Sequence, residues 1–151
     1  RNVFILDFGL ARKFVKDSGE IRTPRAQAGF RGTVRYAPIN CHKFKELGRK
    51  DDLETWFYMQ VEITVGKVPW STCQDMNEVG RLKEANRRDG SLFAGCPPQY
   101  APMLQYIDGL QYWDQPDYNT LYGLIDQACR AGGINDGDPY DWEKPAGGAF
   151  W

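Results

Sequence analysis

The chain has 151 residues, a formal net charge of −1 and a hydrophobic content of 42%, with 14% aromatic residues. This length is that of one domain and is enough to bury a hydrophobic core. The apolar and aromatic content argues against a disordered polymer. The near-neutral charge gives no general attraction to nucleic acid or anionic lipid, and no apolar run reaches the roughly 18 residues of a membrane span. We therefore expect neither a nucleic-acid nor a membrane partner.

The amino end and the cysteines bear on processing and compartment. The first residue is Arg1 rather than Met and no signal peptide follows, so we expect the native protein to extend further at this end. The four cysteines form no CxxC pair and the sequence holds a single histidine, which does not fit a zinc site. Scattered cysteines in a domain of this size are typical of reduced thiols, which predicts a cytoplasmic or nuclear protein.

The first third of the chain is predicted to be extended and irregular. Residues 3–6 form an apolar run typical of a short buried strand, and a second short strand is expected over 10–14. Together they predict a short start resembling a β-hairpin. Residues 15–35 have little periodicity and predict a long loop, and a loop of that length inside a compact domain is usually functional. A basic cluster runs through it: Arg22, Arg25, Arg31 and Arg35.

The next segment predicts a central helix over 51–65. Asp51 and Asp52 are favourable at a helix N-terminus, and Gly66 is a plausible stop. The apolar residues that recur at helical spacing are Leu53, Trp56, Phe57, Val61 and Val65. Since further apolar residues widen this surface, we expect the helix to be buried in the middle of the fold.

The remaining segments predict a packed turn at 68–70 and three more helices. A polar helix over 75–88 is expected to present Lys83, Arg87 and Arg88 to solvent. A helix over 102–110 has a proline in its first turn, and the last helix begins after Pro116 and ends near Arg130. Residues 135–151 form a tail, held loosely or pinned through Trp142. The predicted fold is mainly α, with four to five helices.

Asp7 is the first candidate functional residue. The apolar run 3–6 delivers its carboxylate into a turn that Gly9 can bend, with Phe8 as an apolar anchor. In a phosphotransferase, a carboxylate in such a motif holds the Mg²⁺ that bridges nucleotide phosphates. The alternative is a simple turn aspartate after a strand.

The stretch 32–36 is the second candidate. Gly32 would let the backbone approach a substrate, Thr33 would lie near a catalytic centre, and Arg35 would offer a fork of donors to a phosphate or carboxylate. Arg81 and Lys83 could add to such an anion patch. The alternative is an ordinary strand entry with a solvated arginine.

Several motifs together resemble one family over almost the whole chain, from Val3 to about Glu143. They are Leu6-Asp7-Phe8-Gly9-Leu10-Ala11-Arg12, Pro24-Arg25-Ala26, Ala28-Gly29-Phe30-Arg31-Gly32-Thr33-Val34-Arg35-Tyr36-Ala37, Ile39-Asn40, Asp51-Asp52-Leu53-Glu54, Phe57-Tyr58-Met59, Gly66-Lys67-Val68-Pro69-Trp70, Pro116-Asp117-Tyr118 and Asp138-Pro139-Tyr140-Asp141-Trp142-Glu143. The chain resembles the C-terminal lobe of a eukaryotic protein kinase of the casein kinase one group, most closely the tau-tubulin kinase branch. Pro38 departs from this group, which carries serine there.

The resemblance implies a serine/threonine kinase that uses ATP and Mg²⁺. Asp7 takes the metal-ligand role, while the activation segment and substrate-binding loop carry Gly9, Gly32, Thr33 and Arg35. Members of the group often favour acidic or phosphorylated protein substrates, and Arg35 matches the arginine that binds such anions. Asp52 would lie in the core and accept backbone hydrogen bonds from the catalytic loop, whereas the alternative is a helix cap.

The motifs that kinases carry before Asp-Phe-Gly are not in these 151 residues. These are the glycine-rich loop, the strand lysine, its glutamate partner, and the catalytic-loop aspartate and asparagine, so no general base is present. We expect residues 1–143 to be a partial kinase domain and 144–151 a tail. The 151 residues alone should not catalyse and should bind ATP poorly, and the uncovered face should be apolar. The alternative is a catalytically silent kinase-fold module that binds proteins.

Overall fold

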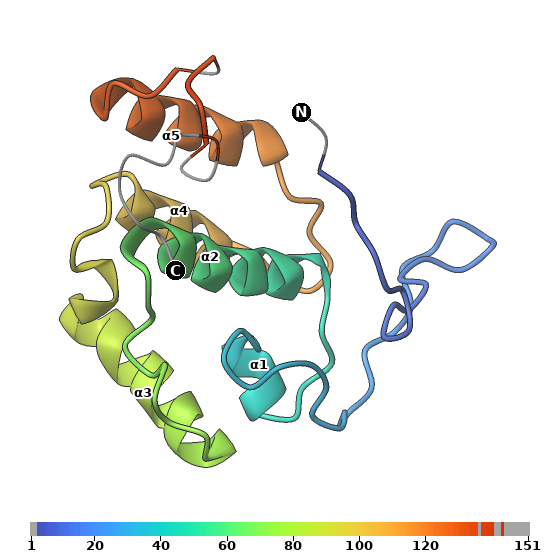
Figure 1. The fold of residues 1–151 in the computed structure, drawn as a ribbon. Helices are drawn as coiled ribbons and strands as arrows, with labels where there is room; N and C mark the ends of the chain where they lie inside the picture. The colour runs from blue at the N-terminus through green and yellow to red at the C-terminus, as the bar shows by residue number, and fades with distance from the viewer. Residues whose placement is uncertain (1–2, 136, 141–142, 144–151) are drawn as a thin grey trace.

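The computed structural model describes residues 3–135, 137–140 and 143, and in this part the chain is mainly helical. The elements are α1 (Ile39–His42), α2 (Arg49–Val65), α3 (Met76–Asp89), the 3₁₀ turn η1 (Ser91–Phe93), α4 (Tyr100–Gly109) and α5 (Tyr118–Ala131). Figure 1 shows α2 in the middle, with α4 and α5 stacked on one side of it and α1 and α3 on the other. The mainly α fold that the sequence predicts is confirmed.

Helix α2 is central because apolar side chains cover most of its circumference. Phe57, Tyr58 and Val61 are fully buried and pack with residues of the following loop and of α4, among them Trp70 and Met103. The helix ends where predicted: Gly66 adopts φ 83°, a left-handed conformation that favours glycine. Its N–H donates to the Glu62 carbonyl at 2.7 Å and closes the last turn.

Local capping signals set the ends of the other long helices. Asp75 accepts the Glu78 N–H at 2.8 Å before α3, and Asp117 accepts the Asn119 N–H at 3.0 Å before α5. Pro102 lies in the first turn of α4, where its missing N–H has no helical partner to lose. The predicted packed turn is also confirmed, since Trp70 is buried and its indole N–H donates to the Arg35 carbonyl at 2.8 Å.

The two predicted strands are wrong. The described part contains no β-strand, and its one isolated antiparallel bridge joins Val15 and Ile21. Hydrogen bonds across residues 14–22 make this turn resemble a hairpin. Residues 3–6 lie 75–93% exposed. They form no strand because a strand needs a partner for its backbone groups, and the described chain offers none. The predicted anchor Phe8 is also exposed.

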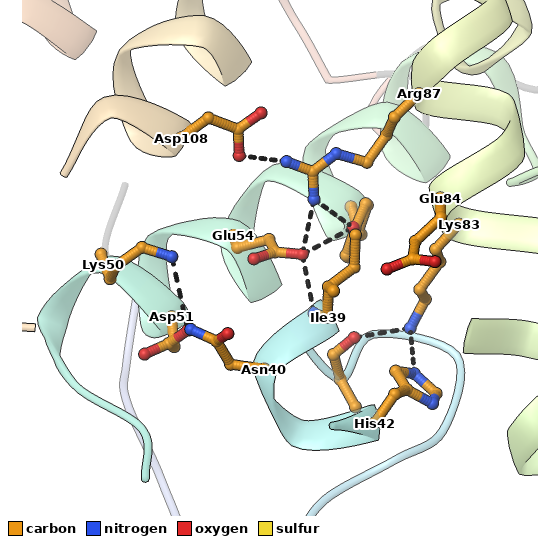
Figure 2. A network of polar contacts seen from close by, with 12 residues as sticks. Ile39, Asn40, His42, Lys50, Asp51, Glu54, Lys83, Glu84, Arg87 and Asp108 are labelled. Carbon is orange, nitrogen blue, oxygen red and sulfur yellow. Dashed lines mark hydrogen bonds and ion pairs between the residues drawn. The ribbon is translucent and has the colours of Figure 1, made fainter. Parts of the chain in front are cut away.

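The predicted solvated face of α3 is wrong for two of its three members. Arg88 is exposed, but Lys83 is fully buried and the Arg87 side chain is only 13% exposed. Both turn toward the centre of the fold, where they meet polar groups of α1, α2 and the segment before α1 (Figure 2). Burial of a charge is tolerated only with such partners.

Arg87 neutralises a buried carboxylate on α2. Glu54 accepts hydrogen bonds from Arg87 at 2.8 Å, from the Tyr58 hydroxyl at 2.7 Å and from the Ile39 N–H at 2.8 Å. Arg87 also contacts Asp108 of α4, so one guanidinium joins three helices (Figure 2). The Ile39 contact fixes the start of α1, which directly follows the candidate loop 32–36.

Lys83 binds both the segment before α1 and the last residue of α1. Its ammonium donates to the carbonyls of Val34 at 2.8 Å and Ala37 at 2.6 Å, and to His42 Nε2 at 3.1 Å. The other ring nitrogen, Nδ1, lies 3.0 Å from the Met76 carbonyl, which can only accept, so Nδ1 carries the proton and Nε2 accepts. Burial lowers the pKa of Lys83 from 10.5 to about 7, against the opposing effect of Glu54.

We expect Arg87→Ala to destabilise the chain far more than Arg88→Ala. The first change leaves Glu54 buried without its counter-charge, which typically costs about 3–5 kcal/mol. The second change removes an exposed side chain of the same type from the neighbouring position. Urea unfolding followed by circular dichroism measures both, and equal losses would contradict the role given to Arg87.

Lys83 predicts a pH dependence of stability. Between the native pKa of about 7 and the ordinary value of 10.5 the unfolded chain binds more protons, so the free energy of unfolding rises with pH. Relative to Lys83→Met, we expect the wild-type chain to gain on the order of 1 kcal/mol per pH unit between about pH 7 and 9. The exposed Lys67→Met serves as control, and parallel curves for wild type and Lys83→Met would refute the expectation.

Candidate functional site

Three distant stretches of the chain surround an open hollow of about 460 Å³. One wall is the segment after Asp-Phe-Gly, including Leu10 and Phe14; a second is the candidate loop with Gly32 and Thr33. The third is the first half of α2, which contributes Asp52 and Thr55. The fold therefore brings together three of the six residues that the sequence singles out, namely Gly32, Thr33 and Asp52.

Asp52 faces this hollow without a partner. Among the described residues no hydrogen bond or ion pair to its carboxylate is found, and the residue is exposed. The surrounding protein nevertheless raises the pKa of the carboxyl through loss of hydration, and the charge of Asp51 adds to the effect. The structure places Asp51, not Asp52, in the core, where it accepts the Gly48 N–H at 2.7 Å and Asn40 at 2.8 Å (Figure 2).

Gly32 and Thr33 form a turn at the edge of the hollow. Gly32 adopts φ 95°, and a Cβ there would meet no atom within 4 Å, so glycine is favoured for conformation rather than for space. The Thr33 carbonyl accepts the N–H groups of Tyr36 at 3.0 Å and Ala37 at 2.9 Å. The turn is thereby tied to the part of the chain that Lys83 holds.

Asp7 and Gly9 do not line the hollow. Asp7 is exposed, adopts φ 61° and accepts the Gly9 N–H on its own side chain at 3.0 Å. A Cβ at Gly9 would lie 3.1 Å from that carboxylate oxygen, so a larger residue would crowd the turn. In the described part of the chain no three His, Cys, Asp or Glu residues gather in a way that could hold a metal ion.

Arg35 points away from the hollow, toward the last turn of α2. Its guanidinium donates to Glu62 at 3.0 Å and to the Ser71 carbonyl at 3.2 Å. The predicted patch of Arg35, Arg81 and Lys83 is wrong, because Lys83 is buried on other partners and Arg81 pairs with Glu78 at 2.9 Å. The sequence does not show which segments cover Lys83.

Sequence reasoning missed Glu46, which ties down the segment after Asp-Phe-Gly. Its carboxylate, 9% exposed, binds Arg12 at 3.0 Å and Arg25 Nη2 at 2.9 Å, and the hydrogen bond from Arg25 chiefly lowers its pKa to about 2. Tyr112 adds a hydrogen bond to the Arg22 carbonyl at 3.0 Å. No local pattern marks Glu46, since its partners lie 34 and 21 residues away.

Glu54 was missed although the sequence does carry a signal for it. It is an acidic residue inside the apolar face of the predicted central helix, between Leu53 and Trp56. A carboxylate at such a position requires a buried partner. The pattern could not say that this partner is Arg87, which lies on another helix.

The cysteines and the helices bear on two further expectations. Cys41, Cys73, Cys96 and Cys129 are free thiols, as the spacing predicts, while their cellular compartment stays a prediction. Within the described residues, none of the helices has the length and apolar character needed to cross a bilayer.

Comparisons with known proteins relate this geometry to a family. No family model matches the chain. A probable serine/threonine-protein kinase of Dictyostelium discoideum is 41% identical over 145 residues, which is 95% of this chain and 29% of the relative. Serine/threonine-protein kinase spe-6 of Caenorhabditis elegans is 37% identical over 94% of this chain and 39% of its own length. Casein kinase I homolog 3 of Saccharomyces cerevisiae is 31% identical over 99% of this chain and 30% of its own length.

The chain thus spans 29–39% of the length of these three relatives. In each case the match extends over nearly all of the present sequence. Together with the mainly helical fold, this confirms the resemblance that the motifs indicate. Over nearly its whole length the chain is similar to proteins named as serine/threonine kinases, among them a casein kinase I homolog.

Proposed function

We propose that this chain is the C-terminal lobe of a protein kinase that transfers phosphate from ATP to serine or threonine of a protein substrate. The observation that carries the proposal is the alignment of nearly the whole chain with proteins named as serine/threonine kinases. In this proposal residues 1–143 form the partial kinase domain, and the predicted tail 144–151 lies outside the described residues. The finer assignment to the tau-tubulin kinase branch stays a prediction from the motifs.

The residues present do not form a complete Mg²⁺ or ATP site. Magnesium in nucleotide sites is held by one or two carboxylates together with phosphates and water. Asp7 offers one carboxylate on an exposed turn, and no group of three or more His, Cys, Asp or Glu residues that could hold a metal ion is found among the described residues. In the proposal Asp7 supplies a single metal ligand, and the other groups that hold ATP and Mg²⁺ come from outside these 151 residues.

In the proposal, the catalytic loop of the longer protein packs into the hollow. Asp52 faces it with both carboxylate oxygens available, as a residue that accepts backbone N–H groups would. Gly32 and Thr33 line the same space and would present the substrate loop to the reacting groups. Gly9 belongs to the activation segment, where Glu46 holds the chain that follows it through Arg12 and Arg25.

The exposed apolar start of the chain supports the same proposal. Val3, Phe4, Ile5 and Leu6 lie 75–93% exposed next to one another. Contiguous apolar surface of this kind is uncommon on an isolated domain and marks a contact with another segment or protein. In a two-lobe kinase, that contact would be with the remaining catalytic parts.

The chain is expected to show no phosphotransfer to casein with Mg²⁺ and ATP, because no general base is present. In a longer protein that includes a catalytic loop, Asp7→Asn should lower turnover by about a hundredfold or more, since a metal ligand is lost. Asp17→Asn, an exposed carboxylate paired with Lys13, is the control. A radiolabelled phosphate assay measures all of these.

Three outcomes of that assay would overturn the proposal or parts of it. Turnover by the 151 residues themselves would contradict the requirement for further catalytic parts. Full activity of Asp7→Asn in the longer protein would remove the metal role. A longer protein without any activity would favour the alternative, a kinase-fold module that binds proteins.

The proposed substrates are proteins with acidic or phosphorylated residues near the target site. Arg35 supports this proposal because its side chain is 43% exposed and its guanidinium has donors beyond those it uses on Glu62 and Ser71. In the longer protein, Arg35→Ala should raise KM for an acidic peptide about fivefold and leave a neutral peptide unchanged. Arg81→Ala is the matched control, and equal changes for both peptides would eliminate the anion role.

A further inference from the structure

Glu62 binds the guanidinium of Arg35, the group to which the proposed function assigns substrate binding. It lies in the last turn of α2, and its Oε1 accepts from Arg35 at 3.0 Å. The Tyr36 hydroxyl donates to the other oxygen, Oε2, and this hydrogen bond raises the pKa of Tyr36. The Glu62 side chain is 17% exposed, less than the 43% of Arg35. The Glu62 side chain is therefore the more buried of the two partners.

The backbone around Arg35 cannot easily move away from Glu62. The Trp70 indole donates to the Arg35 carbonyl at 2.8 Å. On either side, Lys83 binds the carbonyls of Val34 and Ala37 at 2.8 and 2.6 Å. Because three hydrogen bonds from two buried side chains fix this stretch, an anion must meet Arg35 close to where Glu62 holds it.

The charge of Glu62 weakens the binding of an incoming anion to Arg35. A guanidinium has five N–H donors, and the contacts of Arg35 with Glu62 and Ser71 use two of its nitrogens. Donors therefore remain for a second oxyanion, but the Glu62 charge already balances the arginine. An anion that approaches the exposed face meets a nearly neutral pair and the repulsion of a like charge a few ångströms behind it.

We propose that Glu62 is a specificity-determining residue, an internal carboxylate that competes with the oxyanion of a protein substrate for Arg35. This inference rests on the proposed function, in which the loop 32–36 faces the substrate. Removing the charge while keeping the shape should unmask the arginine. Glu62→Gln does so, because the amide oxygen can still accept from Arg35 and the amide nitrogen can still donate to the Tyr36 hydroxyl oxygen.

Titration of the 151-residue chain with inorganic phosphate at pH 8 and fixed ionic strength tests the competition. The Arg35 Nε–H signal in the nitrogen–proton NMR spectrum, assigned from Arg35→Lys, reports binding at this residue. We expect Glu62→Gln to reach half-saturation at about one fifth of the phosphate concentration that the wild type needs, the effect of one partly exposed ion pair. Equal half-saturation, or no shift of Arg35 in either protein, would overturn the inference.

Further variants distinguish the loss of the Glu62 charge from a loss of folding. Glu78→Gln removes a carboxylate that pairs with Arg81, and it should leave the Arg35 titration unchanged. Thermal unfolding checks that Glu62→Gln keeps the fold. If it does not, Glu62→Ala also removes the carboxylate and should reach half-saturation at a lower phosphate concentration than the wild type; a value equal to that of the wild type would then refute the competition.

The titration and the kinase assay fail independently, since phosphate binding requires no turnover. A longer protein without activity, combined with the expected titration, would overturn the proposed function and leave the competition for Arg35 intact. An active protein in which Glu62→Gln leaves phosphate binding unchanged would overturn the role of Glu62 alone.

Discussion

Three buried charged residues, Asp51, Glu54 and Lys83, hold one short stretch of the described chain, residues 34–42. Lys83 binds the carbonyls of Val34 and Ala37 and the ring of His42. Glu54 accepts the N–H that begins α1, and Asp51 binds Asn40 (Figure 2). Charges are buried only when such partners repay the loss of hydration. The position of the candidate loop therefore depends on groups from α2 and α3 rather than on its own sequence.

This arrangement explains how a loop with little regular structure can present fixed side chains. The stretch that contains Arg35 is held from behind by Lys83 and Trp70, while Glu46 secures the segment after Asp-Phe-Gly through two arginines. The hollow lies between these two anchored stretches and the start of α2. Asp52, which faces the hollow, differs from the neighbouring Asp51 in having no partner among the described residues.

Much of the fold was predictable because helices are encoded locally. Asp75, Asp117 and Gly66 act within one turn of the helix end that they set, so the predicted helix bounds agree with the structure to within a few residues. The strands failed for the opposite reason. An apolar run such as 3–6 predicts burial, but whether a strand forms depends on a partner that the local sequence does not contain.

For the candidate site, the sequence by itself determined which residues belong to the kinase motifs, including Asp7, Gly32, Thr33, Arg35 and Asp52. It also determined the mainly helical fold, since periodicity and capping act over a few residues. Only the tertiary structure decided which charges are buried and which meet. Lys83 and Arg87 turn inward, and Arg35 faces Glu62 across 27 residues of sequence. Such pairings depend on the packing of α2, α3 and the connecting loops, and no local pattern specifies that packing.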